Sequence, residues 1–255
     1  MFVIAYAVNC SNFMPMLSIC KKELHQFFSS LTGYIAIILF LLVNGIFLFV
    51  LKDSNIFDFG YATLDKFFEL SPWILIFLVP ALAMRSLSEE FKTGTFEILQ
   101  TKPLSKWQIV IGKYFSVLLV LLFVIVPTFI YIITIKSLSA TDGVDSGGIA
   151  GSYIGLFLLA AVFAAISLCC SSFTNNAVVA FLVSVFVCLL LYFGFNAVSK
   201  LPVFQGHADY YIEMIGIDFH YRSISRGLVD SRDILYFLSL IFLFLLITVQ
   251  NLHKR

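Results

Sequence analysis

Charged residues are scarce in this sequence of 255 residues. Asp, Glu, Lys and Arg together make up 12% of it, whereas 60% of the residues are hydrophobic and the mean hydropathy is +0.99. A water-soluble domain typically has about 25% charged residues. The formal net charge of +1 also argues against a basic face for nucleic acid. The composition therefore predicts an all-α membrane protein whose main surroundings are the lipid bilayer.

A phosphate-binding loop is also missing. The pair Gly112-Lys113 is followed by Tyr114, and Trp107 stands where Gly-x-x-x-x-Gly-Lys-Ser/Thr requires its first glycine. We therefore expect this chain not to be an enzyme and to have no cofactor of its own. The apolar segments lack charged residues near their centres, which argues against ion-coupled transport. Energy for any transport would have to come from another chain, which would bind ATP and magnesium.

Metal-ligand spacing is absent as well. Cysteines stand at positions 10, 20, 169, 170 and 188, a pattern that fits packing rather than a disulfide framework or a metal centre. His207, Asp209 and His220 are conceivable ligands, but their spacing matches no known site, so ordinary polarity is the preferred interpretation. We predict no metal site.

The long apolar runs predict a six-helix transmembrane domain over residues 33–250. The expected spans are 33–51, 70–84, the run from 109 to 135, a fourth span that follows Gly147, then 177–198 and 234–249. Asn44 is the only strongly polar residue of the first span, so we expect it to bond to a neighbouring helix. Pro80 and Pro127 are expected to bend their helices.

The fourth span begins with a regular glycine pattern. Gly147, Gly151 and Gly155 recur every four residues, so they lie along one side of a helix. Small residues let a second helix approach closely in the membrane. We therefore predict that these three glycines form a helix-packing face.

The N-terminal region divides into two predicted parts. Residues 1–15 are apolar but too short to span a bilayer, and they lack the features of a signal peptide, so we treat them as an N-terminal extension. Residues 16–32 predict an amphipathic interfacial helix. Its apolar positions are Leu17, Cys20, Leu24, Phe27, Phe28 and Leu31, and its polar face is Lys21, Lys22, Glu23, His25 and Gln26.

Residues 86–108 form a polar stretch between the second and third spans. Ser105 and Gln108 match the capping box, which starts a helix at Ser105, and Pro103 stops any helix that arrives from the N-terminal side. Residues 93–100 predict a short surface helix with a sharp entry at Gly94. We therefore predict a loop that carries a short amphipathic helix.

The remaining connections set the topology. Residues 169–176 predict a short turn in which Thr174 or Asn175 caps the fifth span. Residues 199–233 predict an outer segment that is helical in part, with a helix end at Arg226-Gly227 and a cap for the last span at Asp230. Six spans place both termini on one side. Assigning them to the cytoplasm puts nine Lys/Arg inside and seven outside, a modest positive-inside bias.

The polar stretch also carries an extended motif. The pattern Glu-Glu-x-x-x-Gly-Thr-x-Glu-x-Leu-x-x-x-Pro-Leu-Ser, followed by Ile-Val-x-Gly-Lys, resembles the cytoplasmic loop of ABC-2 type permeases of ABC transporters. The resemblance implies that this loop carries a coupling helix that contacts an ABC ATPase subunit. The residues assigned to ATPase coupling in this way are Glu89, Glu90, Gly94, Thr95, Glu97, Leu99, Pro103 and Ser105.

A narrower resemblance extends over most of the chain after residue 15. Residues 16–28, 33–35, 153–156, 171–176 and 226–233 resemble the permease subunit associated with bacterial gliding motility. That family implies export across the inner membrane, a second permease copy or related permease, and a pair of ATPase subunits. Two alternatives remain open: a non-transporting scaffold or anchor subunit of a motility complex, and an integral-membrane enzyme acting on lipid.

Overall fold

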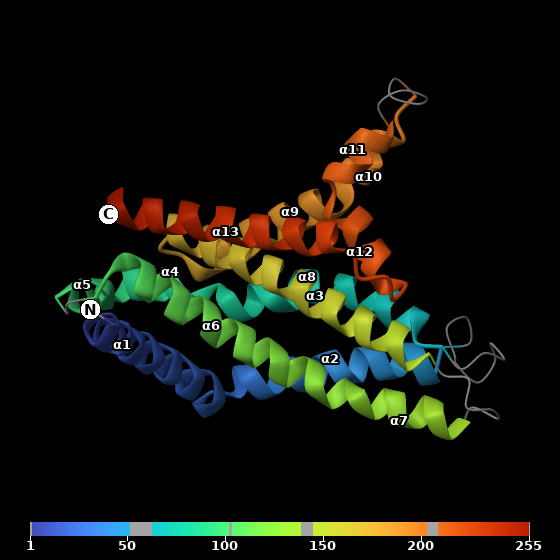
Figure 1. The fold of residues 1–255 in the computed structure, drawn as a ribbon, viewed down its shortest axis with the longest axis horizontal. Coiled ribbons are helices and arrows are strands. Elements are labelled where there is room, and N and C mark those ends of the chain that lie inside the picture. Colours follow the sequence, from blue (N-terminus) through green and yellow to red (C-terminus); the bar gives the residue numbers. More distant parts are fainter. Residues whose placement is uncertain (1, 52–62, 102–103, 139–144, 203–208, 255) are drawn as a thin grey trace.

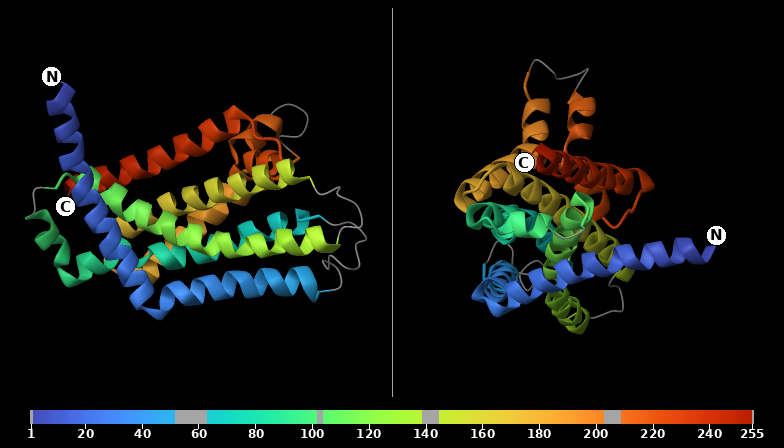
Figure 2. Two further views of the ribbon diagram at one scale, coloured as in Figure 1. Left: turned by 60° about the horizontal axis from the view of Figure 1, so that its bottom comes forward. Right: turned by 90° about the vertical axis from the view of Figure 1, so that its left-hand side faces the viewer.

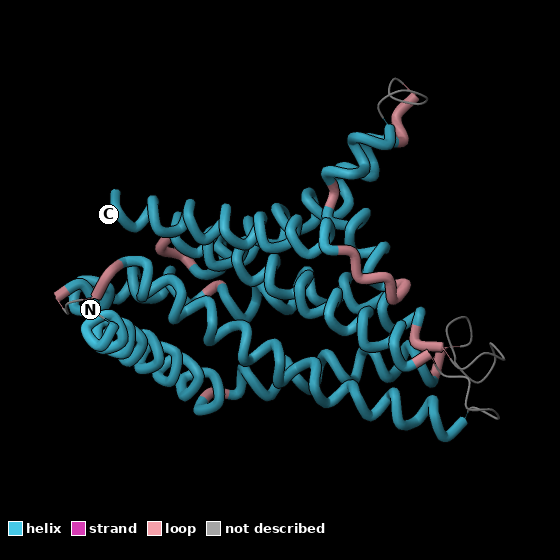
Figure 3. Tube along the Cα trace, viewed as in Figure 1, coloured by secondary structure: helices cyan, strands magenta, loops and turns pink. Residues whose placement is uncertain are grey.

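The computed structural model describes residues 2–51, 63–101, 104–138, 145–202 and 209–254. Every regular element in these ranges is helical (Figure 3). The helices are α1 Phe2–Ser29, α2 Leu31–Phe49, α3 Asp65–Ala83, α4 Arg85–Thr93, α5 Thr95–Gln100, α6 Lys106–Ile125, the 3-10 turn η1 Val126–Thr128, α7 Phe129–Leu138, α8 Ser146–Phe173, α9 Ala177–Leu189, the π-helical η2 Leu190–Gly194, α10 Phe195–Ser199, α11 Asp209–Ile215, α12 Ile217–Ser225 and α13 Ser231–Lys254.

Within the described ranges, five helical stretches are long and apolar enough to cross a membrane. They cover Asp65–Thr93, Lys106–Ser137, Gly147–Phe173, Ala177–Ser199 and Ser231–Lys254. A sixth candidate joins Met16–Ser29 to Gly33–Phe49 across a bend of 67°. Helix α2 lies in the bundle beside α3 and α6 (Figure 1). The all-α membrane fold predicted from composition is therefore confirmed, with five or six spans.

Helix α8 forms the centre of the bundle. Within its most apolar window 78% of the residues are buried, against 28% for α13, so α8 faces protein and α13 faces largely outward. Small side chains at Ala160, Ala161, Ala164 and Ala165 let neighbouring helices approach α8 closely. Helices α3, α6, α9, α12 and α13 all pack on it.

Polar side chains and prolines shape the spans. Ser71 in α3 donates a hydrogen bond to Asn44 in α2 over 3.4 Å, which confirms the expected helix-to-helix bond. Pro127 lies in the 3-10 turn that separates α6 from α7, so the regular helix is interrupted there as predicted. Asn176, rather than Thr174 or Asn175, caps α9, because it directly precedes the helix and its side chain accepts from the Val178 amide.

One end of the bundle gathers segments that are distant in sequence. Helices α4 and α5, the N-terminal part of the chain and the C-terminus of α13 lie at this end, and the far ends of α2 and α7 lie at the other (Figures 1 and 2). Residues 2–15 of the predicted N-terminal extension (1–15) form the first turns of the continuous helix α1. This end is called the α5 end below.

Candidate functional site

The stretch predicted as a loop begins as helix. After α3 the chain breaks at Met84 and continues as α4, so residues 86–93 do not form a loop and the prediction is corrected here. The segment forms a helix because its apolar and polar residues fall on opposite faces: Leu87 is fully buried, whereas Glu89 is exposed. Gly94 ends α4 with φ of 71°, a left-handed conformation that glycine adopts without strain.

A serine from the central helix holds the break at Met84. The Leu87 and Ser88 amides donate to the Ser171 hydroxyl over 3.1 and 3.0 Å, and the same hydroxyl donates to the Met84 carbonyl over 3.1 Å. The first amides of a helix have no acceptor within the helix and need one from outside. Ser171 of α8 therefore links α8 to the start of α4. The sequence predicted a turn at residues 169–176 and did not predict this contact.

Helix α5 rests on α4 through one aromatic contact. The rings of Phe91 and Phe96 meet edge to face with centroids 4.9 Å apart, and Phe96 is buried. Thr95 and Glu97 are exposed on α5, and Leu99 is half-buried. Helix α5 is thus a short projecting element that presents polar side chains to solvent.

The next helix starts as predicted. The Gln108 amide donates to the Ser105 hydroxyl over 3.2 Å, and the Ser105 amide donates to the Gln108 side chain over 2.9 Å. This is the predicted capping box, and it fixes the first residue of α6. Pro103 lies outside the described residues.

A buried cation connects three helices near the start of α6. The Lys113 side chain has no exposed surface, and its Nζ lies 2.7 Å from Glu23 Oε1 of α1 and 2.9 Å from Glu90 Oε1 of α4. It also donates to the Ser86 carbonyl over 2.7 Å. Lys22 adds a longer contact to Glu90 at 3.4 Å. The side chains of Lys22, Glu23, Glu90 and Lys113 are called the Lys113 cluster below.

The burial of Glu23 shows that α1 is oriented differently from the prediction. Glu23 was assigned to the solvated polar face, but it is only 6% exposed because that part of α1 packs on α6. Gly112 permits this packing, since a Cβ there would lie 3.2 Å from the Ile19 side chain and from the Met16 carbonyl. The Gly-Lys pair of the sequence motif is therefore the place where α1 crosses α6.

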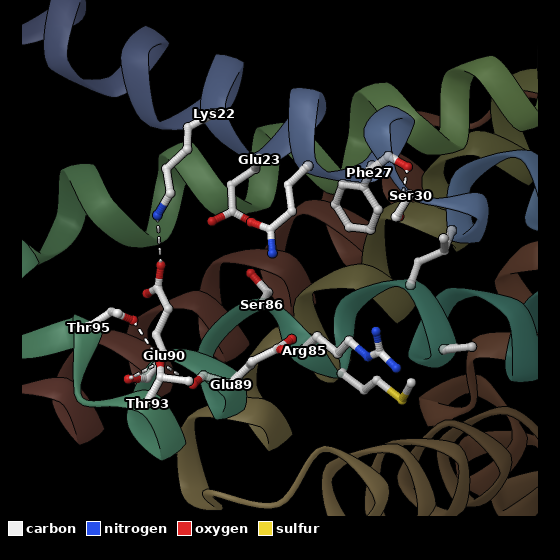
Figure 4. Close-up of a pocket in the computed structure, with 14 residues that line it drawn as sticks. Lys22, Glu23, Phe27, Ser30, Arg85, Ser86, Glu89, Glu90, Thr93 and Thr95 are labelled. Carbon is white, nitrogen blue, oxygen red and sulfur yellow. Dashed lines mark hydrogen bonds and ion pairs between the residues drawn. The ribbon is translucent and has the colours of Figure 1, made fainter.

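An open pocket of about 390 Å³ lies between α1 and α4, beside the Lys113 cluster. Figure 4 shows Lys22, Glu23 and Phe27 on the α1 side, and Arg85, Ser86, Glu89 and Glu90 on the α4 side. The charges in its lining are mixed: Arg85 and Lys22 are basic and three glutamates are acidic. The pocket therefore has no single sign of charge.

The glycine pattern of α8 meets α12 and the residues that follow it. A Cβ at Gly155 would lie 2.6 Å from Ile224 Cγ2, and a Cβ at Gly151 would lie 3.1 Å from the Gly227 carbonyl oxygen. Gly147 instead follows Asp145, which caps α8 by accepting from the Gly147 and Gly148 amides. The structure thus places Gly155 at a close approach to α12, and Gly151 at a close approach to the segment that follows α12.

The end of the bundle away from α5 has its own buried polar groups. His220 Nδ1 lies 2.6 Å from Asp233 Oδ1 of α13. The side chain of His220, which was a conceivable metal ligand, is therefore engaged with Asp233. The Tyr221 hydroxyl donates to the Phe68 carbonyl over 2.7 Å, and burial raises the pKa of Tyr221, so it remains a donor. Among the described residues no three His, Cys, Asp or Glu side chains are grouped to hold a metal ion.

Five of the predicted coupling residues lie on or next to α4. Glu89, Glu90 and Thr95 line the pocket, and Glu90 also belongs to the Lys113 cluster. Gly94, Thr95 and Glu97 are exposed near the tip. Lys113 was part of the motif, but its role as a buried partner of Glu23 was not predicted, because the two residues are 90 positions apart.

These features define a multi-pass helical membrane protein with a projecting helix pair at one end of the bundle. The family model described as ABC-2 family transporter protein matches residues 17–212. The chain therefore belongs to the ABC-2 transporter family, whose members are membrane components of ABC transporters. A search of curated proteins found no match.

Proposed function

We propose that this chain is the membrane-spanning permease subunit of an ATP-driven exporter, and that a separate ABC ATPase contacts α5 and the exposed face of α4. Membership of the ABC-2 family supports the transporter class. The sequence has no phosphate-binding loop, which is consistent with ATP and magnesium being bound by the partner.

The observation that carries the proposal is the contrast between an exposed tip and a buried attachment. Glu97 and Thr95 are exposed on α5, whereas α4 is joined to the interior through Glu90 and Lys113 and through the hydroxyl of Ser171. A force applied to the tip by a soluble subunit therefore reaches α1 and α6 through the Lys113 cluster, and α8 through Ser171. Domain closure in the ATPase would move these helices together.

The proposal includes an orientation and a setting. The α5 end faces the cytoplasm of a bacterium, both termini lie there, and the chain is embedded in the inner membrane beside a second copy or a related permease. The positive-inside bias supports this orientation. The resemblance of residues 226–233 and the other segments to the gliding-associated permease supports a role in gliding motility.

The experiment is co-purification of the chain from its native membranes, identification of the ATPase that accompanies it, and reconstitution of both into vesicles. The variant Glu97→Arg should reduce ATPase binding by about tenfold, because an exposed charge at an interface centre is reversed. Glu69→Arg, at an exposed glutamate on α3 away from the α5 end, is the matched control and should bind normally.

Two results would contradict the proposal. Undiminished ATPase binding and transport by Glu97→Arg would remove α5 from the interface. Normal assembly with no ATP-dependent movement of any solute or lipid would instead favour the non-transporting scaffold.

A further inference from the structure

Two residues that line the pocket between α1 and α4 carry buried polar atoms without a hydrogen-bond partner in the part of the chain that the structure describes. Ser86 is 6% exposed, and its hydroxyl has no hydrogen-bond partner among the described residues; the same holds for Glu90 Oε2. Both residues line the pocket, and Ser86 extends from α4 toward α1 in Figure 4. Both atoms are closed to solvent, and a buried polar atom without a partner is costly, so a positive group bound in the pocket would offset part of this cost.

Two further charges face the same space. Arg85 and Glu89 are exposed on α4 and lie one helical turn apart, about 6 Å along the helix axis. Neither side chain takes part in an ion pair among the described residues, although both line the pocket. In Figure 4 Glu89 lies between Glu90 and Arg85 on the α4 side of the pocket, and the Arg85 head group extends away from the two glutamates.

An apolar surface continues from the arginine end of the pocket. Ala81 and Leu82 line the pocket next to Arg85. Trp73, Phe77 and Ala81 are exposed at successive turns of α3, and α3 belongs to a membrane-spanning stretch. Along α3 and α4 the accessible groups are therefore apolar side chains, then a cation, then carboxylates.

We propose that this pocket binds the head group of a zwitterionic aminophospholipid, of the phosphatidylethanolamine type. The lipid phosphate lies at Arg85, whose planar guanidinium suits a phosphate. The ammonium donates to the exposed carboxylate of Glu89 and lies near the negative charge of Glu90. The acyl chains follow Ala81, Phe77 and Trp73. The order of groups in such a lipid, from hydrocarbon to phosphate to amine, matches the order of groups along the protein.

Other occupants match less well. A choline head group carries no N–H donor for Glu89 and Glu90, and an anionic glycerol lipid brings no cation to these carboxylates. A side chain of the ATPase would not need the apolar continuation along α3. The volume of about 390 Å³ is within the range of small-molecule sites. A lipid held here touches both α1 and α4 beside the Lys113 cluster, so it would stabilise their contact.

Lipid binding by the full-length chain, purified in detergent without the ATPase, tests the proposal. Native mass spectrometry with dioleoyl phosphatidylethanolamine, phosphatidylcholine and phosphatidylglycerol should give at least about tenfold tighter binding of the ethanolamine lipid, the difference expected for charged hydrogen bonds. Arg85→Gln should weaken binding of the ethanolamine lipid by about tenfold. Glu89→Gln should remove most of its advantage over phosphatidylcholine.

The control is Lys92→Gln, which removes an exposed cation of α4 that does not line this pocket and should leave binding unchanged. Arg85→Lys and Glu89→Asp keep the charges and should retain part of the preference, which separates ligand binding from misfolding. Equal binding of all three lipids, or a preference for phosphatidylglycerol, overturns the proposal. So does normal ethanolamine-lipid binding by Arg85→Gln. Because no ATPase is present, these results leave the proposed transport function untouched.

Discussion

Lys113 is completely buried, although lysine is rarely found in protein interiors without a partner. Two carboxylates and one carbonyl surround its ammonium group, so its donors are occupied. Removing one member of such a group leaves an opposite charge buried and unpaired, and that loss typically exceeds the gain from forming the group. The cluster is therefore sensitive to single substitutions.

We predict that Lys113→Met lowers the free energy of unfolding by about 3 kcal/mol, because Glu23 and Glu90 would lose their cation. Thermal unfolding in detergent measures the change. Lys92→Met, at an exposed lysine of α4, is the control and should stay within about 0.5 kcal/mol of the original protein.

The triple variant Lys113→Met, Glu23→Gln, Glu90→Gln should recover part of the loss, since no unpaired charge remains. If the triple variant is less stable than Lys113→Met alone, the carboxylates contribute to the fold in some other way than by pairing with Lys113.

At the scale of elements, the joint between α3 and α4 depends on a hydroxyl from another helix. We predict that Ser171→Ala destabilises the protein by about 1–3 kcal/mol and increases amide hydrogen exchange in α4, because two amides lose their shared acceptor. Exchange measured by mass spectrometry reports this directly. Ser167→Ala is the control, since the Ser167 hydroxyl donates to the Phe163 carbonyl of its own helix. If amide exchange in α4 is the same in Ser171→Ala and Ser167→Ala, the Ser171 hydroxyl does not stabilise the connection between α3 and α4.

The approach of α12 to α8 gives a second prediction at this scale. Gly155→Ala should destabilise the protein by about 1–3 kcal/mol, because the added methyl group would overlap Ile224. Gly147→Ala should be nearly neutral, since the nearest atom to its Cβ is an Asp145 side-chain oxygen at 3.4 Å. Thermal unfolding of the two variants compares the positions, and an equal effect would contradict the assigned contact.

At the scale of the whole molecule, the termini and α5 share one end of the bundle. In a variant whose native cysteines are replaced, we predict that cysteines introduced at Glu97 and Lys254 resist an impermeant maleimide in intact cells, whereas one at Lys136 reacts. The reason is that Lys136 lies near the end of α7, at the opposite end of the bundle. Labelling of Glu97→Cys from outside would reverse the proposed orientation.

The sequence predicts local features of this fold better than distant contacts. The capping box at Ser105, the helix end at Gly227 and the break at Pro127 depend on residues within one or two turns, so their patterns were readable. The burial of Glu23 and the role of Ser171 depend on partners 80 or more positions away, which periodicity does not encode. The same limit applies to the site: the motif identified Glu90, but only the structure connects it to α1.

The length of α1 has a mechanical consequence. The helix has 28 residues, so it extends about 42 Å from the bend at Ser30, whereas Glu23 lies only about 10 Å from that bend. The Lys113 cluster therefore lies on the short part of α1 next to the bend, and most of the helix extends beyond it. A displacement of about 1 Å at Glu23 corresponds to about 4 Å at the tip of the helix if α1 pivots as a rigid rod. In that case the tip of α1 would be displaced further than the Lys113 cluster, and a protein bound at the tip would experience the larger displacement.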